Sequence, residues 1–309
     1  MAGIQYAYDQ AMAAMIELPN PFTGESGVIR LLEAEAFDRV ALCARILEGT
    51  YDQPFVIDDG DSRSLYFSRA FTQSLMRLSN PTALEFAYTR QMMSFLLFVH
   101  APRHILMFGL GGGSLVKYCY RYLPYARLTA LEISPQVLAF REQFCVPPND
   151  ARLQVLLGDA ADYLRQAALQ HQPGQQHDAD VIMIDAFDRD GFSASVCSRR
   201  FYLDVRDALT SQGVMVANMV GPKAERAAHL AMIAEVFGGN IMLLPVERDG
   251  NYLVFAFRDA GFEPRWRWIE SQTKAMQSRY GLDFPKFAHE LKRSRKDGYL
   301  QNILLQPEA

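Results

Sequence analysis

The stretch His104 to Ser114, HILMFGLGGGS, decides the fold of this chain. Its residues Ile105 to Phe108 form an apolar run of strand length, and Leu115 to Tyr122 has the pattern of a helix. Glycine lets the backbone approach a ligand closely, and a helix N-terminus offers unpaired N–H groups and a partial positive charge. The turn between strand and helix is therefore predicted to bind a nucleotide or another polar cofactor through Gly109, Gly111, Gly112 and Gly113.

The glycine turn alone has low specificity. Gly109, Gly111 and Ser114 nearly match the dinucleotide pattern GxGxxG, but many α/β domains carry glycine at such a turn for packing alone. A second predicted strand, Arg127 to Leu131, is followed by Glu132, about twenty residues past the glycines, where a carboxylate commonly holds ribose hydroxyls. The turn and this carboxylate together favour a ligand site over a packing feature.

Strands and helices alternate regularly after Glu132, which predicts a mostly parallel sheet covered on both faces. The strand over Leu153 to Leu157 is followed by Asp159, and the strand over Asp180 to Ile184 is followed by Asp185. Asp159 could simply cap a helix, and Asp185 could close a turn. Because the carboxyl ends of parallel strands meet at one rim, we expect both carboxylates to lie beside Glu132 and the glycine turn.

The last two predicted strands, Ile241 to Val246 and Tyr252 to Phe257, are joined by a connection so short that they must pair antiparallel. This ending disfavours a nicotinamide dehydrogenase and resembles the class I AdoMet-dependent transferases, with a Rossmann-like sheet and an antiparallel last strand. We assign residues 1–26 to an N-terminal arm, 27–83 to a small β-rich domain, 84–260 to the Rossmann-like α/β domain and 261–309 to a helical tail. Residues 58–62 are predicted to form a hairpin turn in the small domain.

Composition limits the function classes. The chain of 309 residues is 50% hydrophobic and 21% charged, as in soluble globular proteins, and its net charge of −4 argues against a nucleic-acid partner. The four cysteines lie far apart without metal-ligand spacing, which favours buried thiols in the cytoplasm. The six histidines also lack ligand spacing, so no metal site is expected. Neither a secretory signal nor a membrane span is expected.

Over about residues 50 to 258 the chain resembles the spermidine synthase-like aminopropyltransferases. The resemblance rests on a set of motifs: LEFAYTRQMM, FGLGGGSL, ALEISPQV, LGDAADYL, DVIMIDAFDRDG, RRFYLDVRDAL and GVMVANM. It implies a small N-terminal β domain, a Rossmann-like catalytic domain and a dimer or larger oligomer, which we take as a homodimer. It also implies transfer of an aminopropyl group from decarboxylated AdoMet to a small-molecule amine in polyamine biosynthesis.

The resemblance assigns roles to individual residues. Glu132 would hold the ribose of the AdoMet-type cofactor, and Asp159 with Ala160 would meet the adenine. Asp185 would be the catalytic carboxylate that accepts a proton from the amine nucleophile. The remaining implied residues bind the acceptor substrate or line its site: Gln73, Tyr88 and Asp188.

Four positions depart from the family pattern. Gly112 stands where the family has an Asp that pairs with the amino group of decarboxylated AdoMet. Ser94, Arg90 and Arg189 replace a His, a Glu and a Pro, and these changes weaken the case for a dication such as putrescine. A bare glycine turn could instead accept the carboxylate of intact AdoMet. An AdoMet-dependent methyltransferase is therefore an alternative, and a non-catalytic binding protein is a third hypothesis.

Overall fold

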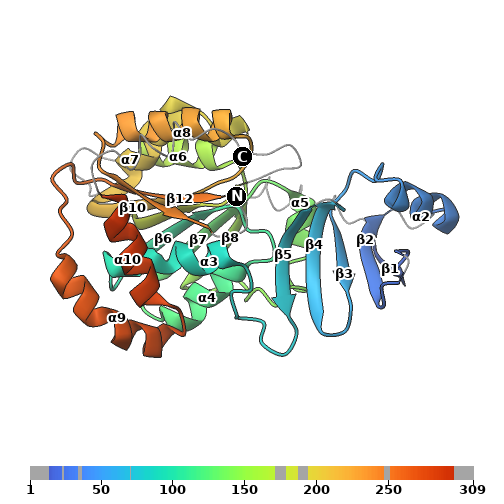
Figure 1. Ribbon diagram of the computed structural model, residues 1–309. Helices are drawn as coiled ribbons and strands as arrows, with labels where there is room; N and C mark the ends of the chain where they lie inside the picture. Colours follow the sequence, from blue (N-terminus) through green and yellow to red (C-terminus); the bar gives the residue numbers. More distant parts are fainter. Residues whose placement is uncertain are drawn as a thin grey trace.

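Two β-sheets lie side by side in the computed structural model (Figure 1). The structure describes residues 14–22, 24–33, 37–69, 71–170, 179–186, 194–246 and 251–295. The first sheet has five strands in the order β1-β2-β3-β4-β5, and the second has seven in the order β11-β12-β10-β9-β6-β7-β8. This arrangement confirms a Rossmann-like α/β fold preceded by a small β domain.

The small sheet is antiparallel throughout. Its β3–β4 hairpin turns where the sequence predicts it. The helix between β2 and β3 is capped by Asp38, which accepts the N–H groups of Val40 and Ala41. Its core is built around Ile29 and Leu31, both fully buried. The elements are β1 (Ala14–Pro19), β2 (Val28–Glu33), α2 (Arg39–Leu47), β3 (Phe55–Asp58), β4 (Ser62–Ser68) and β5 (Phe71–Arg77).

The first strand differs from the sequence analysis, which places residues 1–26 in an arm. Residues 14–19 form β1 and pair with β2 over six positions. Leu18 is buried in the core of the small sheet, whereas Glu17 faces outward and pairs with Arg30. The alternation that marks a strand covers only a few residues here, and the prolines that follow it obscure the signal.

The large sheet is parallel except at one side. Strand β9 pairs parallel with β10 and β6, β6 with β7, and β7 with β8, while β12 runs antiparallel between β10 and β11. The predicted antiparallel ending is therefore confirmed. The strands are β6 (His104–Phe108), β7 (Arg127–Glu132), β8 (Leu153–Leu157), β9 (Ala179–Ile184), β10 (Leu209–Met219), β11 (Ile241–Pro245) and β12 (Tyr252–Phe257).

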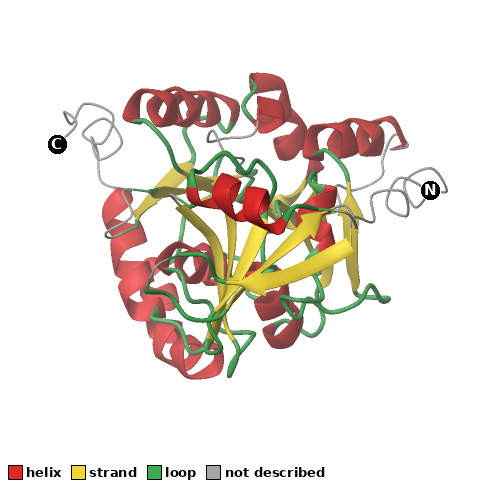
Figure 2. Ribbon diagram, turned by 90° about the vertical axis from the view of Figure 1, so that its right-hand side faces the viewer, coloured by secondary structure: helices red, strands yellow, loops and turns green. Residues whose placement is uncertain are grey.

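Helices cover both faces of this sheet (Figure 2). In β6, Ile105 and Met107 face one apolar core, whereas Leu106 and Phe108 face the other, which explains why these four successive positions are all apolar. The first core includes residues of α3 (Ala87–Met92), η1 (Met93–Leu97), α4 (Ser114–Tyr122), α5 (Pro135–Ala139), α9 (Trp266–Tyr280) and α10 (Phe284–Ser294). The second includes residues of α6 (Ala160–Gln170), η2 (Ala194–Val196), α7 (Arg199–Ala208) and α8 (Lys223–Val236). In the ranges that the structure describes, no helix is long and apolar enough to cross a membrane.

Candidate active site

The glycine turn links the end of β6 to the start of α4. Gly109, Gly111 and Gly113 have φ values of 93°, 52° and 66°, a left-handed backbone that favours glycine. A Cβ at Gly109 would overlap the backbone carbonyl of Asp185, and the Asp185 N–H donates to the carbonyl of Phe108 at 2.9 Å. Glycine at position 109 therefore lets the segment after β9 reach the turn.

Glu132, at the end of β7, holds the turn from the other side. Its Oε2 accepts the N–H groups of Leu110 at 3.0 Å and Gly111 at 3.4 Å, and its Oε1 accepts the Ser134 N–H at 2.9 Å. The side chain is buried, with 7% of its surface exposed, yet it still lines a cavity. Oε1 accepts only one of these three hydrogen bonds, so its second lone pair can accept a ribose hydroxyl, as the sequence analysis predicts.

The middle of the turn packs against other parts of the chain. The Gly112 N–H donates to Ser74 Oγ at 2.8 Å, and a Cβ at Gly112 would lie 2.8 Å from the Phe144 ring. A Cβ at Gly113 would overlap Val146. Gly109 and Gly111 line the adjacent cavity, whereas Gly112 and Gly113 are not among its described lining residues. The four glycines therefore divide into two that face the cavity and two that allow close packing.

A cavity of about 730 Å³ opens beside the turn, at the carboxyl ends of the parallel strands. Ligands of open α/β sheets bind at this edge. The cavity brings together residues that the sequence analysis predicts from segments far apart in the chain: Gln73, Tyr88, Gly109, Gly111, Glu132, Asp159, Ala160 and Asp185. Asp188, the other predicted substrate residue, lies outside the described residues.

The charge of this cavity has one sign. Glu132, Asp159 and Asp185 supply three carboxylates, and no Lys, Arg or His is found among the described residues that line it. Asp159 also accepts the Asp162 N–H at 3.0 Å, so it stabilises the start of α6 while it lines the cavity. Such a surface attracts cationic groups and repels anionic ones.

Asp185 is half-buried and held by two side chains. Asn218 Nδ2 donates to its Oδ1 at 3.0 Å, and the Tyr88 hydroxyl donates a second hydrogen bond. Burial raises the pKa of Asp185 above its ordinary value, and the two hydrogen bonds oppose that rise by stabilising the charged form. The carboxylate is thus both oriented and made more basic than an exposed aspartate.

Asn218 and Asn251 are site residues that the sequence analysis missed. Asn218 is 2% exposed in β10, and its Oδ1 accepts Nδ2 of Asn251 at 3.4 Å, so a chain of two amides leads to Asp185. The available signal was an amide near the carboxyl end of the apolar run GVMVANM, at the rim that carries the carboxylates.

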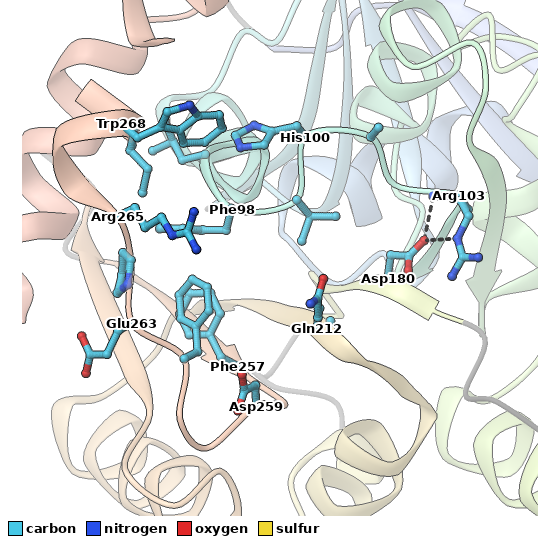
Figure 3. Close-up of a pocket in the computed structure, with 17 residues that line it drawn as sticks. Phe98, His100, Arg103, Asp180, Gln212, Phe257, Asp259, Glu263, Arg265 and Trp268 are labelled. Carbon is cyan, nitrogen blue, oxygen red and sulfur yellow. Dashed lines mark hydrogen bonds and ion pairs between the residues drawn. The ribbon is translucent and has the colours of Figure 1, made fainter. Parts of the chain in front are cut away.

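A second cavity, of about 700 Å³, lies at the opposite edge of the sheet (Figure 3). Acidic and basic side chains both line it. Among them, Asp180 is already engaged, because the Arg103 N–H donates to it at 2.7 Å and the Arg103 guanidinium pairs with it at 3.5 Å. Trp268 is 47% exposed here and packs edge-on against His100. This cavity lies at the amino ends of β6 and β9, so the first cavity is the candidate active site.

No group of three His, Cys, Asp or Glu side chains within the described ranges is placed to hold a metal ion. The candidate site is therefore built from carboxylates, amides, aromatic side chains and the glycine turn.

Comparison with known proteins identifies the family. Residues 85–236 match the family model described as the spermine/spermidine synthase domain. A polyamine aminopropyltransferase of Neisseria meningitidis serogroup B is 33% identical over 241 residues, which cover 77% of this chain and 89% of that protein. The chain belongs to the spermine/spermidine synthase family.

Solved structures agree with the observed fold. A probable spermidine synthase from Corynebacterium glutamicum is 19% identical with a TM-score of 0.58, covering 77% of this chain and 91% of that one. Human methyltransferase-like protein 13, solved in complex with SAH, is 21% identical with a TM-score of 0.54, covering 72% of this chain and 94% of that one. The spermine/spermidine synthase family and this methyltransferase thus share one fold.

Two departures from the spermine/spermidine synthase pattern lie away from the cavity. Arg90 donates through Nη1 to the carbonyls of Leu84 and Glu85, both at 2.7 Å. Ser94 is fully buried, and its hydroxyl has no hydrogen-bond partner. Neither residue is among the described lining residues of the cavity. The expectation that they weaken the binding of a dication is therefore not supported by their position. Arg189 lies outside the described residues.

Proposed function

We propose that this protein is an aminopropyltransferase that uses decarboxylated AdoMet and a small-molecule amine in polyamine biosynthesis. The observation that carries the proposal is the cavity with three carboxylates and no cationic side chain among its described lining residues. Decarboxylated AdoMet carries a sulfonium and an ammonium group, and an amine acceptor is also cationic near neutral pH. The polyamine aminopropyltransferase activity named for the Neisseria relative supports the same conclusion.

The hydrogen bonds of the turn favour the decarboxylated donor over intact AdoMet. The N–H groups of Gly109 and Gly113 donate to main-chain carbonyls, those of Leu110 and Gly111 to Glu132, and that of Gly112 to Ser74. All five are therefore satisfied within the chain. The sequence analysis leaves open the alternative that a bare turn accepts a carboxylate, but residues 109–113 present no unengaged N–H for that purpose.

The donor side of the cavity fits the adenosine part of an AdoMet-type molecule. We assign Glu132 to the ribose hydroxyls, and Asp159 with Ala160 to the adenine. Glu132 is the last residue of β7, and Asp159 and Ala160 come shortly after β8. All three line the cavity. When bound, the donor supplies a carbon that the adjacent sulfonium makes electrophilic.

Asp185 activates the acceptor in this proposal. An amine is protonated near neutral pH and cannot attack until its proton is removed, and the Asp185 carboxylate takes up that proton. A raised pKa makes the carboxylate a better proton acceptor. Tyr88 and Asn218 fix its orientation, so that the lone pair of the amine is directed along the line of attack. We assign Gln73 to the wall of the acceptor site and Asp188 to the far amine of a diamine.

The test is a product assay read by mass spectrometry. The purified protein is incubated with a panel of amines and with either decarboxylated AdoMet or AdoMet, and the mass gained by each amine is measured. We expect the gain of one aminopropyl group with the decarboxylated donor, and at least about a hundredfold slower product formation by Asp185→Asn. Gain of a methyl group from intact AdoMet would contradict the proposal.

A methyltransferase that uses intact AdoMet is the second candidate, and Gly112 favours it because no carboxylate at that position repels the donor's own. If the folded protein binds neither donor in a calorimetric titration, the non-catalytic hypothesis is favoured instead. The proposal also includes a homodimer and a cytoplasmic location. Light scattering of the purified protein tests the dimer, and cell fractionation tests the location.

A further inference from the structure

Ser74, in β5 of the small sheet, contacts the glycine turn of the large domain. Its side chain is buried, with 9% of the residue exposed, and its Oγ accepts the Gly112 N–H at 2.8 Å. A Cβ at Gly111 would lie 2.7 Å from Ser74 Oγ, and a Cβ at Gly112 would lie 2.9 Å from Ser74 Cβ. One serine of the small sheet therefore fills the space beside two successive glycines of the turn.

The hydrogen bond from Gly112 differs from the others in the turn. The N–H groups of Gly109 and Gly113 bond to main-chain carbonyls, and those of Leu110 and Gly111 bond to a carboxylate of the same domain. Within the five-residue turn, the Gly112 N–H alone is held by a neutral hydroxyl, and that hydroxyl comes from the other sheet. If the Ser74 hydroxyl were removed, the Gly112 N–H would therefore be the donor of the turn most readily available to an anionic ligand.

The opposite side of the turn cannot move to make room. The Phe144 ring packs where a side chain on Gly112 would begin, and Lys117 Nζ donates to the Phe144 carbonyl at 2.8 Å. Lys117 is itself 2% exposed, so this contact is buried. The turn is thus held between Phe144 and Ser74, and the serine closes it on the side of the cavity that it lines.

We infer that Ser74 is a specificity-determining residue that excludes donors with a carboxylate at their amino-acid end. A buried carboxylate needs N–H donors to replace its water, and Ser74 occupies both the Gly112 N–H and the space beside it. An ammonium group requires no such donor and is attracted by the acidic cavity. The inference rests on the proposed function, because it explains how the site selects decarboxylated AdoMet.

The experiment is a calorimetric titration of the full-length protein with AdoMet and with decarboxylated AdoMet. The variants are Ser74→Ala, which frees the Gly112 N–H, and Ser74→Cys, which fills the same space with a somewhat larger atom that is a poorer acceptor. The matched control is Ser64→Ala on the adjacent strand β4, since Ser64 is also 9% exposed and does not line the cavity. Thermal unfolding of each variant without ligand confirms that it is folded.

We expect the wild type to prefer the decarboxylated donor, Ser74→Ala to reduce this preference by at least about tenfold through tighter AdoMet binding, and Ser74→Cys to lie between them. Ser64→Ala should keep the wild-type preference. An unchanged ratio in both Ser74 variants, or equal weakening of both donors, would overturn the inference and leave Ser74 a structural residue. A wild type that prefers AdoMet would instead contradict the proposed function.

Discussion

The two edges of the large sheet carry cavities of similar size but different electrostatic character, since one is acidic and the other has mixed charge. At the carboxyl edge, about 730 Å³ is lined by three carboxylates without a cationic side chain among the described lining residues. At the amino edge, about 700 Å³ is lined by both acidic and basic side chains, among them the pair between Arg103 and Asp180. Volume therefore does not distinguish the two cavities, whereas the excess of one charge sign does.

The largest expected effect is a loss of activity when a carboxylate is removed at the carboxyl edge but not at the amino edge. Asp185→Asn should lower kcat/KM about 10²- to 10⁴-fold, because it removes the group that accepts the amine's proton. The counterpart at the other edge is Asp180→Asn, which removes a charge that pairs with Arg103 and accepts backbone N–H groups. It should lower the melting temperature and leave kcat/KM within about threefold. Equal losses of activity in steady-state kinetics would show that the edges are not functionally distinct.

The next contrast compares the stability cost of adding a side chain to one glycine at each edge. Gly109→Ala should destabilise the fold by about 3 kcal/mol or more, since the new Cβ overlaps the Asp185 carbonyl and φ is 93°. Gly213→Ala at the amino edge should cost only about 1 kcal/mol, because its nearest contacts, to Leu209 and Thr210, are at 3.0 Å and its φ is not in the left-handed region. Urea denaturation measures both, and a larger loss at Gly213 would contradict this ranking.

Asn218, which donates to the proposed catalytic carboxylate, should give a smaller effect that depends on pH. Activity should fall on the acid side as Asp185 becomes protonated, with a midpoint above the ordinary range of an aspartate because burial raises its pKa. Asn218→Ala removes a hydrogen bond to the charged form, so this midpoint should move to still higher pH and kcat/KM should fall roughly 10- to 100-fold. A pH–rate profile checks both; a reduced rate with an unmoved midpoint would argue against the assigned role.

The smallest expected effect comes from a substitution in the amino-edge cavity, which tests whether that cavity contributes to activity. Trp268→Ala should leave kcat/KM unchanged within about twofold and should cost about 1 kcal/mol of stability, because the ring is 47% exposed. Burial lowers the pKa of His100, which packs against this ring, so the pKa should return toward its ordinary value. NMR titration of His100 measures the shift. A clear loss of activity would indicate that the amino-edge cavity contributes to the reaction.

The sequence predicts the parts of this molecule that depend on local pattern. The apolar runs of β6 and β9, the glycine turn and the carboxylates after β7, β8 and β9 are placed correctly because each is set by neighbouring residues. The helical segment before β6 is divided into α3 and η1, a division that hydrophobic periodicity does not reveal.

Contacts between distant segments explain what the sequence analysis missed. Asn218 meets Asp185 across adjacent strands, and Ser74 meets Gly112 across the two sheets. No local pattern encodes these pairs, because each depends on how separately folded elements dock. The alternative that the glycine turn binds a carboxylate fails for this reason, since the N–H groups of the turn find partners that only the assembled fold supplies.

The close approach of Gly109 to Asp185 has a consequence for protein engineering. The carbonyl of one segment occupies the volume that a side chain of the other would need, so the two segments form one geometric unit although they lie far apart in the chain. A designer who grafts this glycine turn onto another scaffold must transfer the residues that follow β9 as well. Loop exchange at either segment alone would displace donor site and base relative to each other.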